Sequence, residues 1–168
     1  MNRNVPPMRQ LVVSILIASC AALGFVESAP AQSPLPKATA TPAPNALEVE
    51  VLGMRNDHGQ VGCSLFNDPP SFPRDESKVI RHAWAPIHGG KAICEFPGLA
   101  AGEYAAVVYH DENGNGKFDE NFLGMPKEGF GFSRDAPARL SAPTFDEANF
   151  KYDGKHLRIP IHIRYWPL

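Results

Sequence analysis

HLRIPIHIRYW, residues 156–166, places an apolar side chain at every second position. This period of two is typical of a β-strand with one buried face and one exposed face. The apolar set is Leu157, Ile159, Ile161, Ile163 and Tyr165, and the polar set is His156, Arg158, His162 and Arg164. Pro160 falls between the polar positions and has no backbone N–H to donate, so we expect an edge strand or a strand with a bulge.

The same alternation recurs towards the N-terminus. ALEVEV (46–51) places Glu48 and Glu50 on the exposed face, and QVGCSLF (60–66) resumes the pattern after the turn sequence NDHG (56–59). Two such segments joined by a turn predict a β-hairpin.

Other short segments bounded by Gly, Pro or Asp are also typical of strands: KVIRHAWAPI (78–87), KAICEF (91–96) and EYAAVVYHD (103–111). Only PTFDEANF (143–150) has a helical start signal, and it is short. The pattern predicts an all-β fold, an antiparallel β-sandwich of about seven short strands of the immunoglobulin-like or transthyretin-like kind, preceded by an N-terminal signal helix.

The N-terminus resembles an export signal. Basic residues precede the apolar run LVVSILIASCAALGFV (11–26), and APA (29–31) offers a cleavage site after Ala31. We therefore expect residues 1–31 to be a signal peptide, a periplasmic or secreted mature protein, and no membrane span after signal removal. IASC (17–20) resembles a lipoprotein signal, so anchoring through a lipidated Cys20 is the alternative.

Behind the signal, QSPLPKATATPAPNA (32–46) has nothing to bury and is expected to be a disordered spacer, which leaves 47–168 as the single domain. Cleavage after Ala31 removes two arginines and one glutamate, so the formal net charge becomes −3, against −2 for the whole chain. Without a basic run, nucleic acid is not an expected partner.

Cleavage also leaves two cysteines, Cys63 and Cys94, in a compartment that permits disulfides. Both lie in the inward phase of their predicted strands, which permits a bridge across the core. We predict a Cys63–Cys94 disulfide, with two buried free thiols as the alternative.

Oxygen-bearing side chains are densest in YHDENGNGKFDENFLGMPKEGFGFS (109–133). Counted from Asp111, the spacing is that of a calcium loop, with a glycine at position 6 for the sharp turn. Ligands at positions 1, 3, 5, 7 and 9 would be Asp111, Asn113, Asn115, Lys117 and Asp119.

Position 12 of this loop is Phe122 rather than the bidentate glutamate of an EF-hand. Glu120 and Glu128 are therefore the candidates for the closing carboxylate, and the expected affinity for Ca²⁺ is weak, ~10⁻⁴–10⁻³ M. The alternative is a turn without metal, in which Asp and Asn side chains cap the backbone and Gly114 and Gly116 take positive φ.

His110 precedes this loop, which suggests a metal-assisted envelope hydrolase using His110 and the loop carboxylates. Adjacent strand residues point to opposite faces, however, so a structural role for His110 is favoured. Because the chain also has no nucleophile elbow or phosphate loop, we predict no catalytic residues and no enzyme.

The aromatic residues of the same stretch have two interpretations. Phe130 and Phe132 alternate with glycines, so they either present a ligand or partner surface or turn inward to cover one end of the sandwich. Trp84 and Trp166 are expected in core or rim packing.

Together, GQVGCSLF (59–66), GEYAAVVYHDENGNGKFDENFLGMPKEGFGFS (102–133), APTFDEANF (142–150) and IPIHIRY (159–165) resemble the bacterial domain-of-unknown-function family 2141, a group of small exported proteins. The resemblance covers 47–165 and implies a single exported β-rich domain without supplying an activity or substrate. More loosely, the pattern is similar to transthyretin-like and collagen-adhesin B-type sandwiches, some of which hold calcium in such loops. We thus expect a non-catalytic exported module that binds calcium weakly and contacts a protein or small ligand at the cell envelope.

Overall fold

The computed structural model describes residues 45–138 and 141–167. The predicted signal peptide, nearly all of the spacer and Cys20 lie outside these residues. Within the described part of the chain, no helix has the length and apolar character needed to cross a bilayer.

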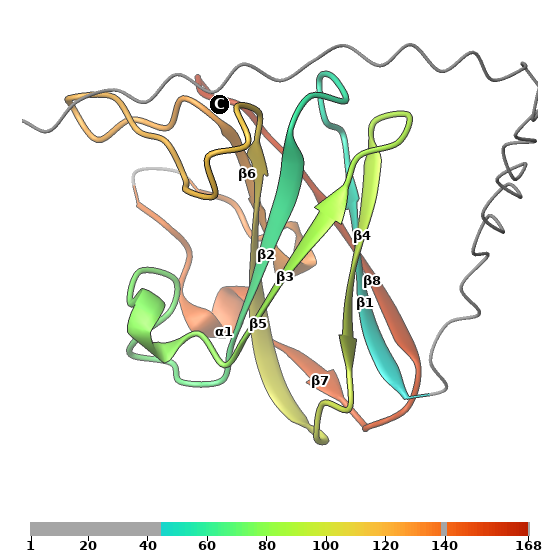
Figure 1. Ribbon diagram of the computed structural model, residues 1–168. Helices are drawn as coiled ribbons and strands as arrows, with labels where there is room; N and C mark the ends of the chain where they lie inside the picture. Colours follow the sequence, from blue (N-terminus) through green and yellow to red (C-terminus); the bar gives the residue numbers. More distant parts are fainter. Residues whose placement is uncertain (1–44, 139–140, 168) are drawn as a thin grey trace, which may run out of the picture. The chain divides into compact units, whose positions relative to one another are not determined.

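Two β-sheets pack face to face (Figure 1). One sheet has three strands in the order β4–β1–β8, and the other has the order β3–β2–β5–β6, with β7 paired to β5 as its fifth strand. The eight strands are β1 (Ala46–Leu52), β2 (Gln60–Phe66), β3 (Arg81–Pro86), β4 (Lys91–Pro97), β5 (Gly102–Asp111), β6 (Gly129–Phe132), β7 (Phe150–Tyr152) and β8 (Leu157–His162). The predicted β-sandwich is confirmed, with one strand more than the expected seven.

The predicted hairpin of β1 and β2 is wrong. β1 pairs with β4 and β8, whereas β2 pairs with β3 and β5 in the other sheet. Each strand has one fully apolar face. Such faces are buried equally well whether the two strands lie side by side in one sheet or oppose each other across a core. The turn at 53–59 therefore carries the chain from one sheet to the other.

β8 is an edge strand, as Pro160 predicts, because it pairs with β1 alone. This pair is parallel, unlike the other strand pairs described, and sets Glu48 opposite Arg158. Glu48 was expected to face solvent but is buried, and its carboxylate accepts a hydrogen bond from Arg158 Nε at 2.6 Å.

Residues from both sheets form the sandwich core. Its fully buried members include Leu47, Val61, Leu65, Val108 and Ile161. The Cys63–Cys94 disulfide joins β2 to β4, with 6.4 Å between the two Cα atoms, and so links the two sheets through the core.

A second apolar group, the outer cluster, covers the opposite face of the five-stranded sheet. Its members are Phe66, Phe72, Ala105, Phe132, Ala136, Phe145 and Ala148. They come from β2, β5, β6 and three short helical pieces with their flanking loops, namely η1 (Glu76–Lys78), η2 (Ser133–Asp135) and α1 (Phe145–Ala148). α1 starts where the sequence predicts, because Thr144 and Glu147 form a capping box.

Candidate functional site

Asp111 ends β5 and anchors the loop that follows. Its side chain is buried, with Oδ1 accepting from Asn115 N at 3.0 Å, and Oδ2 from Gly116 N at 2.8 Å and Gln60 Nε2 at 3.0 Å. Burial raises the pKa of Asp111, but these hydrogen bonds outweigh it and the pKa lies below its ordinary value. The carboxylate therefore stays charged and holds the turn.

Two asparagines complete the turn. Asn113 Oδ1 accepts from Asn115 N at 2.9 Å, and Asn115 Oδ1 accepts from Lys117 N at 2.8 Å, while Gly114 and Gly116 have φ of 70° and 75°. The side-chain N–H groups of the two asparagines donate to the carboxylate of Asp119. The distance is 2.7 Å from Asn113 and 3.2 Å from Asn115 to each carboxylate oxygen. A cation at Asp119 would have to replace these N–H groups.

Glu128 closes the loop from its far end. Its Oε1 accepts from Glu112 N at 3.2 Å and its Oε2 from Asp119 N at 3.0 Å, and the side chain is buried. Burial raises the pKa of Glu128, and the charges of Asp119 and Asp111 raise it further against the effect of the two N–H donors. Of the two candidate closing carboxylates, Glu128 thus lies against the loop, whereas Glu120 is exposed.

Across the described residues, no three His, Cys, Asp or Glu side chains gather closely enough to hold a metal ion. A cation in this loop would therefore depend on two carboxylates together with carboxamide and backbone oxygens. Asp111, Asp119 and Glu128 also form no ion pair with a basic side chain in the described part of the chain.

His110 lies on the core side of β5 and Asp111 on the outer side. Its ring is fully buried, with Nδ1 2.6 Å from Tyr165 Oη and Nε2 2.8 Å from the carbonyl oxygen of His58. Both ring nitrogens are thus engaged in structural hydrogen bonds, so His110 does not share a site with Asp111 or Asp119.

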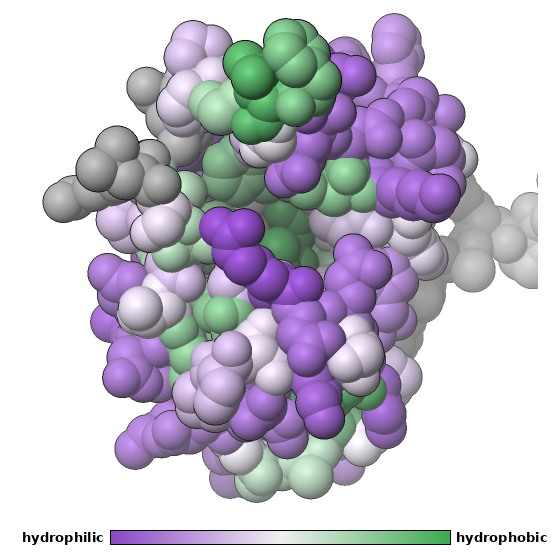
Figure 2. Space-filling view, turned by 90° about the vertical axis from the view of Figure 1, so that its left-hand side faces the viewer, coloured by the Kyte–Doolittle hydropathy of each residue, from purple (hydrophilic) through white to green (hydrophobic). Residues whose placement is uncertain are grey.

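A cleft of about 690 Å³ opens on the outer face of the five-stranded sheet, between η1 and the loop at 112–128. We call it the aromatic cleft because its lining includes Phe66, Tyr109, Phe118, Phe130, Phe132 and Trp166. Figure 2 shows a hollow on this face, with apolar groups at its floor and both hydrophilic and apolar groups around its mouth. Phe130 and Phe132 therefore belong to this outer face rather than to one end of the sandwich core.

A serine and a histidine meet at the sheet surface beside the cleft. Ser64 Oγ lies 2.9 Å from His82 Nδ1, and the histidine ring contacts Trp84 with 4.8 Å between centroids. Burial lowers the pKa of His82, although the charge of Glu76 acts in the opposite direction. Among the described residues no carboxylate accepts from the other ring nitrogen, so the pair lacks the third group that orients the base of a catalytic triad.

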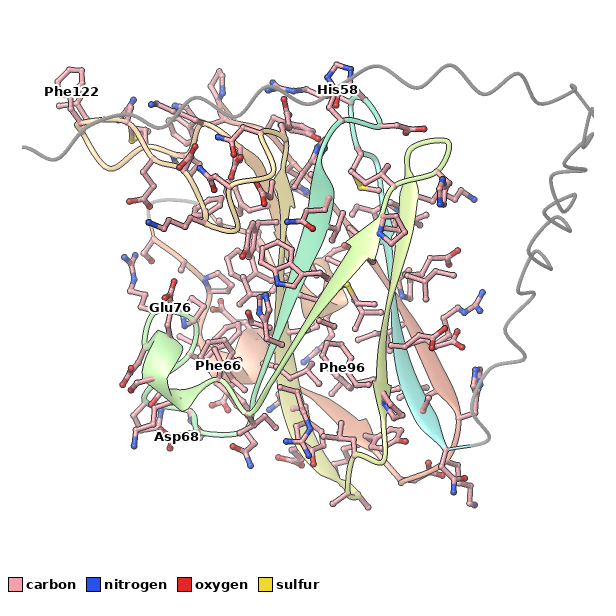
Figure 3. The ribbon with its side chains drawn as sticks, in the orientation of Figure 1. His58, Phe66, Asp68, Glu76, Phe96 and Phe122 are labelled. Atoms are coloured by element: carbon pink, nitrogen blue, oxygen red, sulfur yellow. A yellow bond between two sulfur atoms is a disulfide. The ribbon has the colours of Figure 1, made fainter. Side chains whose placement is uncertain are left out.

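The loop at 112–128 also has an apolar tip. Phe122 is 94% exposed and Leu123 is 70% exposed, and Phe122 projects away from the sheets (Figure 3). In the sequence, Phe122 is only a departure from the EF-hand pattern, and the alternating segments do not predict the cleft. The sequence feature that could have indicated the cleft is the alternation of phenylalanine with glycine in GFGF (129–132).

The fold defines a small β-sandwich domain with a disulfide between its two sheets and a loop-framed cleft on one face. The model of a bacterial family described as "uncharacterized protein conserved in bacteria" (DUF2141) matches residues 49–160, and the chain belongs to this family. No curated protein and no solved structure matches the chain. The resemblance to the family is thereby confirmed, and the looser likeness to transthyretin-like and collagen-adhesin sandwiches stays a prediction.

Proposed function

We propose that the protein is an exported, non-catalytic binding module whose ligand site is the aromatic cleft. The cleft carries this proposal, because its volume of about 690 Å³ is that of small-molecule sites and its lining combines aromatic rings with a few polar groups. The Ser64–His82 pair at its edge lacks the third member of a catalytic triad. Binding is therefore the role that the geometry favours.

Export is supported by the N-terminal sequence and by the cysteines. An apolar run followed by APA (29–31) is typical of a cleaved signal, and a disulfide between sheets suits an oxidising compartment. We place the protein in the periplasm or outside the cell, with a lipid anchor at Cys20 as the alternative. The exposed tip of Phe122 and Leu123 is a contact surface for an envelope partner.

We also propose that the loop at 111–119 binds calcium weakly. Asp111 and Asp119 are the two carboxylates that a cation in this loop would neutralise, and Asp111 is buried. The side chains of Asn113 and Asn115 would then turn so that their oxygens face a cation bound at Asp119, where their N–H groups now face the carboxylate. Calcium tolerates such neutral oxygen ligands.

Thermal melts of residues 32–168 in calcium, magnesium and chelator test the loop. Calcium alone is expected to raise the melting temperature, because a ligand that binds only the folded state stabilises it. Asp119→Asn should reduce this rise while leaving the melt in chelator nearly unchanged, since the carboxamide is isosteric. Equal melts in all three buffers would remove the calcium proposal.

A blocked cleft tests the binding role. Val107 lines the cleft, so Val107→Trp should fill it, whereas Ile93→Trp places the same side chain on the exposed face of the other sheet. Small molecules that stabilise the wild type should also stabilise the Ile93 variant but not the Val107 variant. Equal stabilisation of all three proteins would place the ligand site elsewhere.

A further inference from the structure

Four rings of the cleft floor form a connected row that continues to Trp84, which contacts the row from outside the cleft lining. Edge-to-face contacts run from Trp84 to Tyr109 at 5.6 Å, then to Phe118 at 5.8 Å, Phe130 at 6.0 Å and Phe132 at 5.9 Å between centroids. These rings come from β3, β5, β6 and the loop at 112–128. The cleft therefore offers several negatively polarised ring faces to one ligand.

Tyr109 lies flat across the neighbouring strand because the residue opposite it is a glycine. A Cβ at Gly62 would lie 2.5 Å from the Tyr109 ring. Gly62 and Tyr109 are directly paired between β2 and β5. The glycine thus gives the ring room to form the floor of the cleft instead of standing upright from the sheet.

Carboxylates outnumber basic groups by two to one in the lining of the cleft. Glu76 from η1 and Glu120 from the loop line the cleft, together with one guanidinium, that of Arg74. No ion pair neutralises either glutamate within the described residues. Figure 3 shows Glu76 on the part of η1 that faces the loop at 112–128.

Tyr109 and Glu76 line the same cleft, one with an aromatic ring and the other with a carboxylate. The face of a phenol ring is negatively polarised. A ligand between the two groups therefore meets negative potential from both. These surroundings disfavour an anionic ligand and favour a cationic one.

We propose that the aromatic cleft binds a small organic cation of the quaternary-ammonium class, with its charged head between the Tyr109 ring and the Glu76 carboxylate. Aromatic faces and carboxylates together recognise such a head, which is too large and too weakly hydrated to need hydrogen-bond donors or acceptors. This inference rests on the proposed binding role of the cleft and adds the chemical class of the ligand.

The test compares choline with its neutral carbon isostere, 3,3-dimethylbutan-1-ol, on the full mature chain. Trp166 lines the cleft and Trp84 contacts Tyr109, so tryptophan fluorescence reports binding. Choline is expected to bind about tenfold more tightly than the alcohol, because only the cation gains from the ring faces and the carboxylates.

Two charge-neutral variants locate the effect. Glu76→Gln and Glu120→Gln should each weaken choline several-fold while leaving the alcohol unchanged, and Glu95→Gln on the exposed face of β4 should change neither. Unchanged melting temperatures would show that all three variants remain folded.

The outcomes separate the two proposals. If the alcohol binds as tightly as choline, or if neither cleft glutamate affects choline, the cation inference is wrong while the cleft remains a binding site. If neither compound changes the fluorescence up to its solubility limit, and blocking the cleft with Val107→Trp abolishes no ligand-induced stabilisation, both proposals fall.

Discussion

At the scale of single residues, Glu48 shows how a charge is accommodated in the sandwich. Its side chain is 1% exposed, and its carboxylate lies 2.6 Å from Arg158 Nε and 3.3 Å from His156 Nε2. Alternation alone predicted that Glu48 would face solvent. It is buried because the parallel strand β8 places Arg158 opposite it.

Arg158→Ala is expected to destabilise the fold by about 1.5–3 kcal/mol, because it leaves a buried carboxylate without its main donor. Chemical denaturation measures this loss. Replacing both partners with leucine should recover much of the stability, since two apolar groups need no pairing. Lys151→Ala, which breaks an exposed pair with Glu103, is the control, and an equal loss there would argue against a special role for Glu48.

The buried carboxyl of Glu128 should make the stability of the fold depend on pH. Because its folded-state pKa is raised above the ordinary value of 4.5, the folded protein binds this proton more tightly than the unfolded chain does. Stability contributed through Glu128 therefore falls as pH rises through the window just above 4.5 and returns as pH falls through it. Glu128→Gln removes this titration.

Denaturation of wild type and Glu128→Gln at a series of pH values measures the effect. The wild type should gain stability relative to the variant as the solution is acidified towards the ordinary pKa of glutamate. Glu95→Gln on the exposed face of β4 serves as the control. Parallel profiles for the wild type and Glu128→Gln would show that Glu128 is not a stability-linked titrating group.

At the scale of elements, β6 depends on its glycines. The strand has the sequence GFGF (129–132), with its phenylalanines lining the cleft and its glycines facing the end of β8 and the segment that follows it. A Cβ at Gly129 would lie 2.5 Å from both Ile163 Cγ2 and the Tyr165 ring. A backbone bridge between Phe130 and Arg164 holds the two segments at this short separation.

Gly129→Ala is expected to cost about 1–3 kcal/mol, because the added methyl must push apart the packed side chains of Ile163 and Tyr165. Gly102→Ala is a matched control in β5, where the nearest atoms belong to the outer end of the Tyr104 ring at 3.2–3.3 Å. Thermal melts of the two variants compare them. A smaller loss at Gly129 than at Gly102 would mean that β6 and the C-terminal segment are not closely packed.

At the scale of the whole molecule, the alternating pattern predicted strands but not their partners. β2, β4 and β5 were predicted within a residue or two, because each has a regular apolar face. β6 and β7 were missed, since four or three residues are too few to show a period. The cleft was missed as well, because its walls come from segments that are distant in sequence and meet only through the fold.

The sandwich core and the outer cluster lie on opposite sides of the five-stranded sheet, and we predict that the outer cluster can unfold separately. Phe72 is the centre of the outer cluster, with centroid distances of 5.5 Å to Phe66, 6.0 Å to Phe132 and 6.0 Å to Phe145. Phe72→Ala removes all three contacts but touches no member of the sandwich core. We expect the loss to detach the segments around η1 and α1 while the disulfide-linked sheets stay folded.

Native-state hydrogen exchange measures this directly. Amide protection should fall in 67–80, 133–138 and 141–149. It should persist in β2 and β4, which the disulfide joins, and in β1, which pairs with β4. A Phe-to-Ala change in a buried site costs about 3–5 kcal/mol when the whole domain unfolds as one unit. If protection instead falls equally in every strand, the two apolar groups form a single cooperative unit, and the wall of the cleft is as stable as the sandwich beneath it.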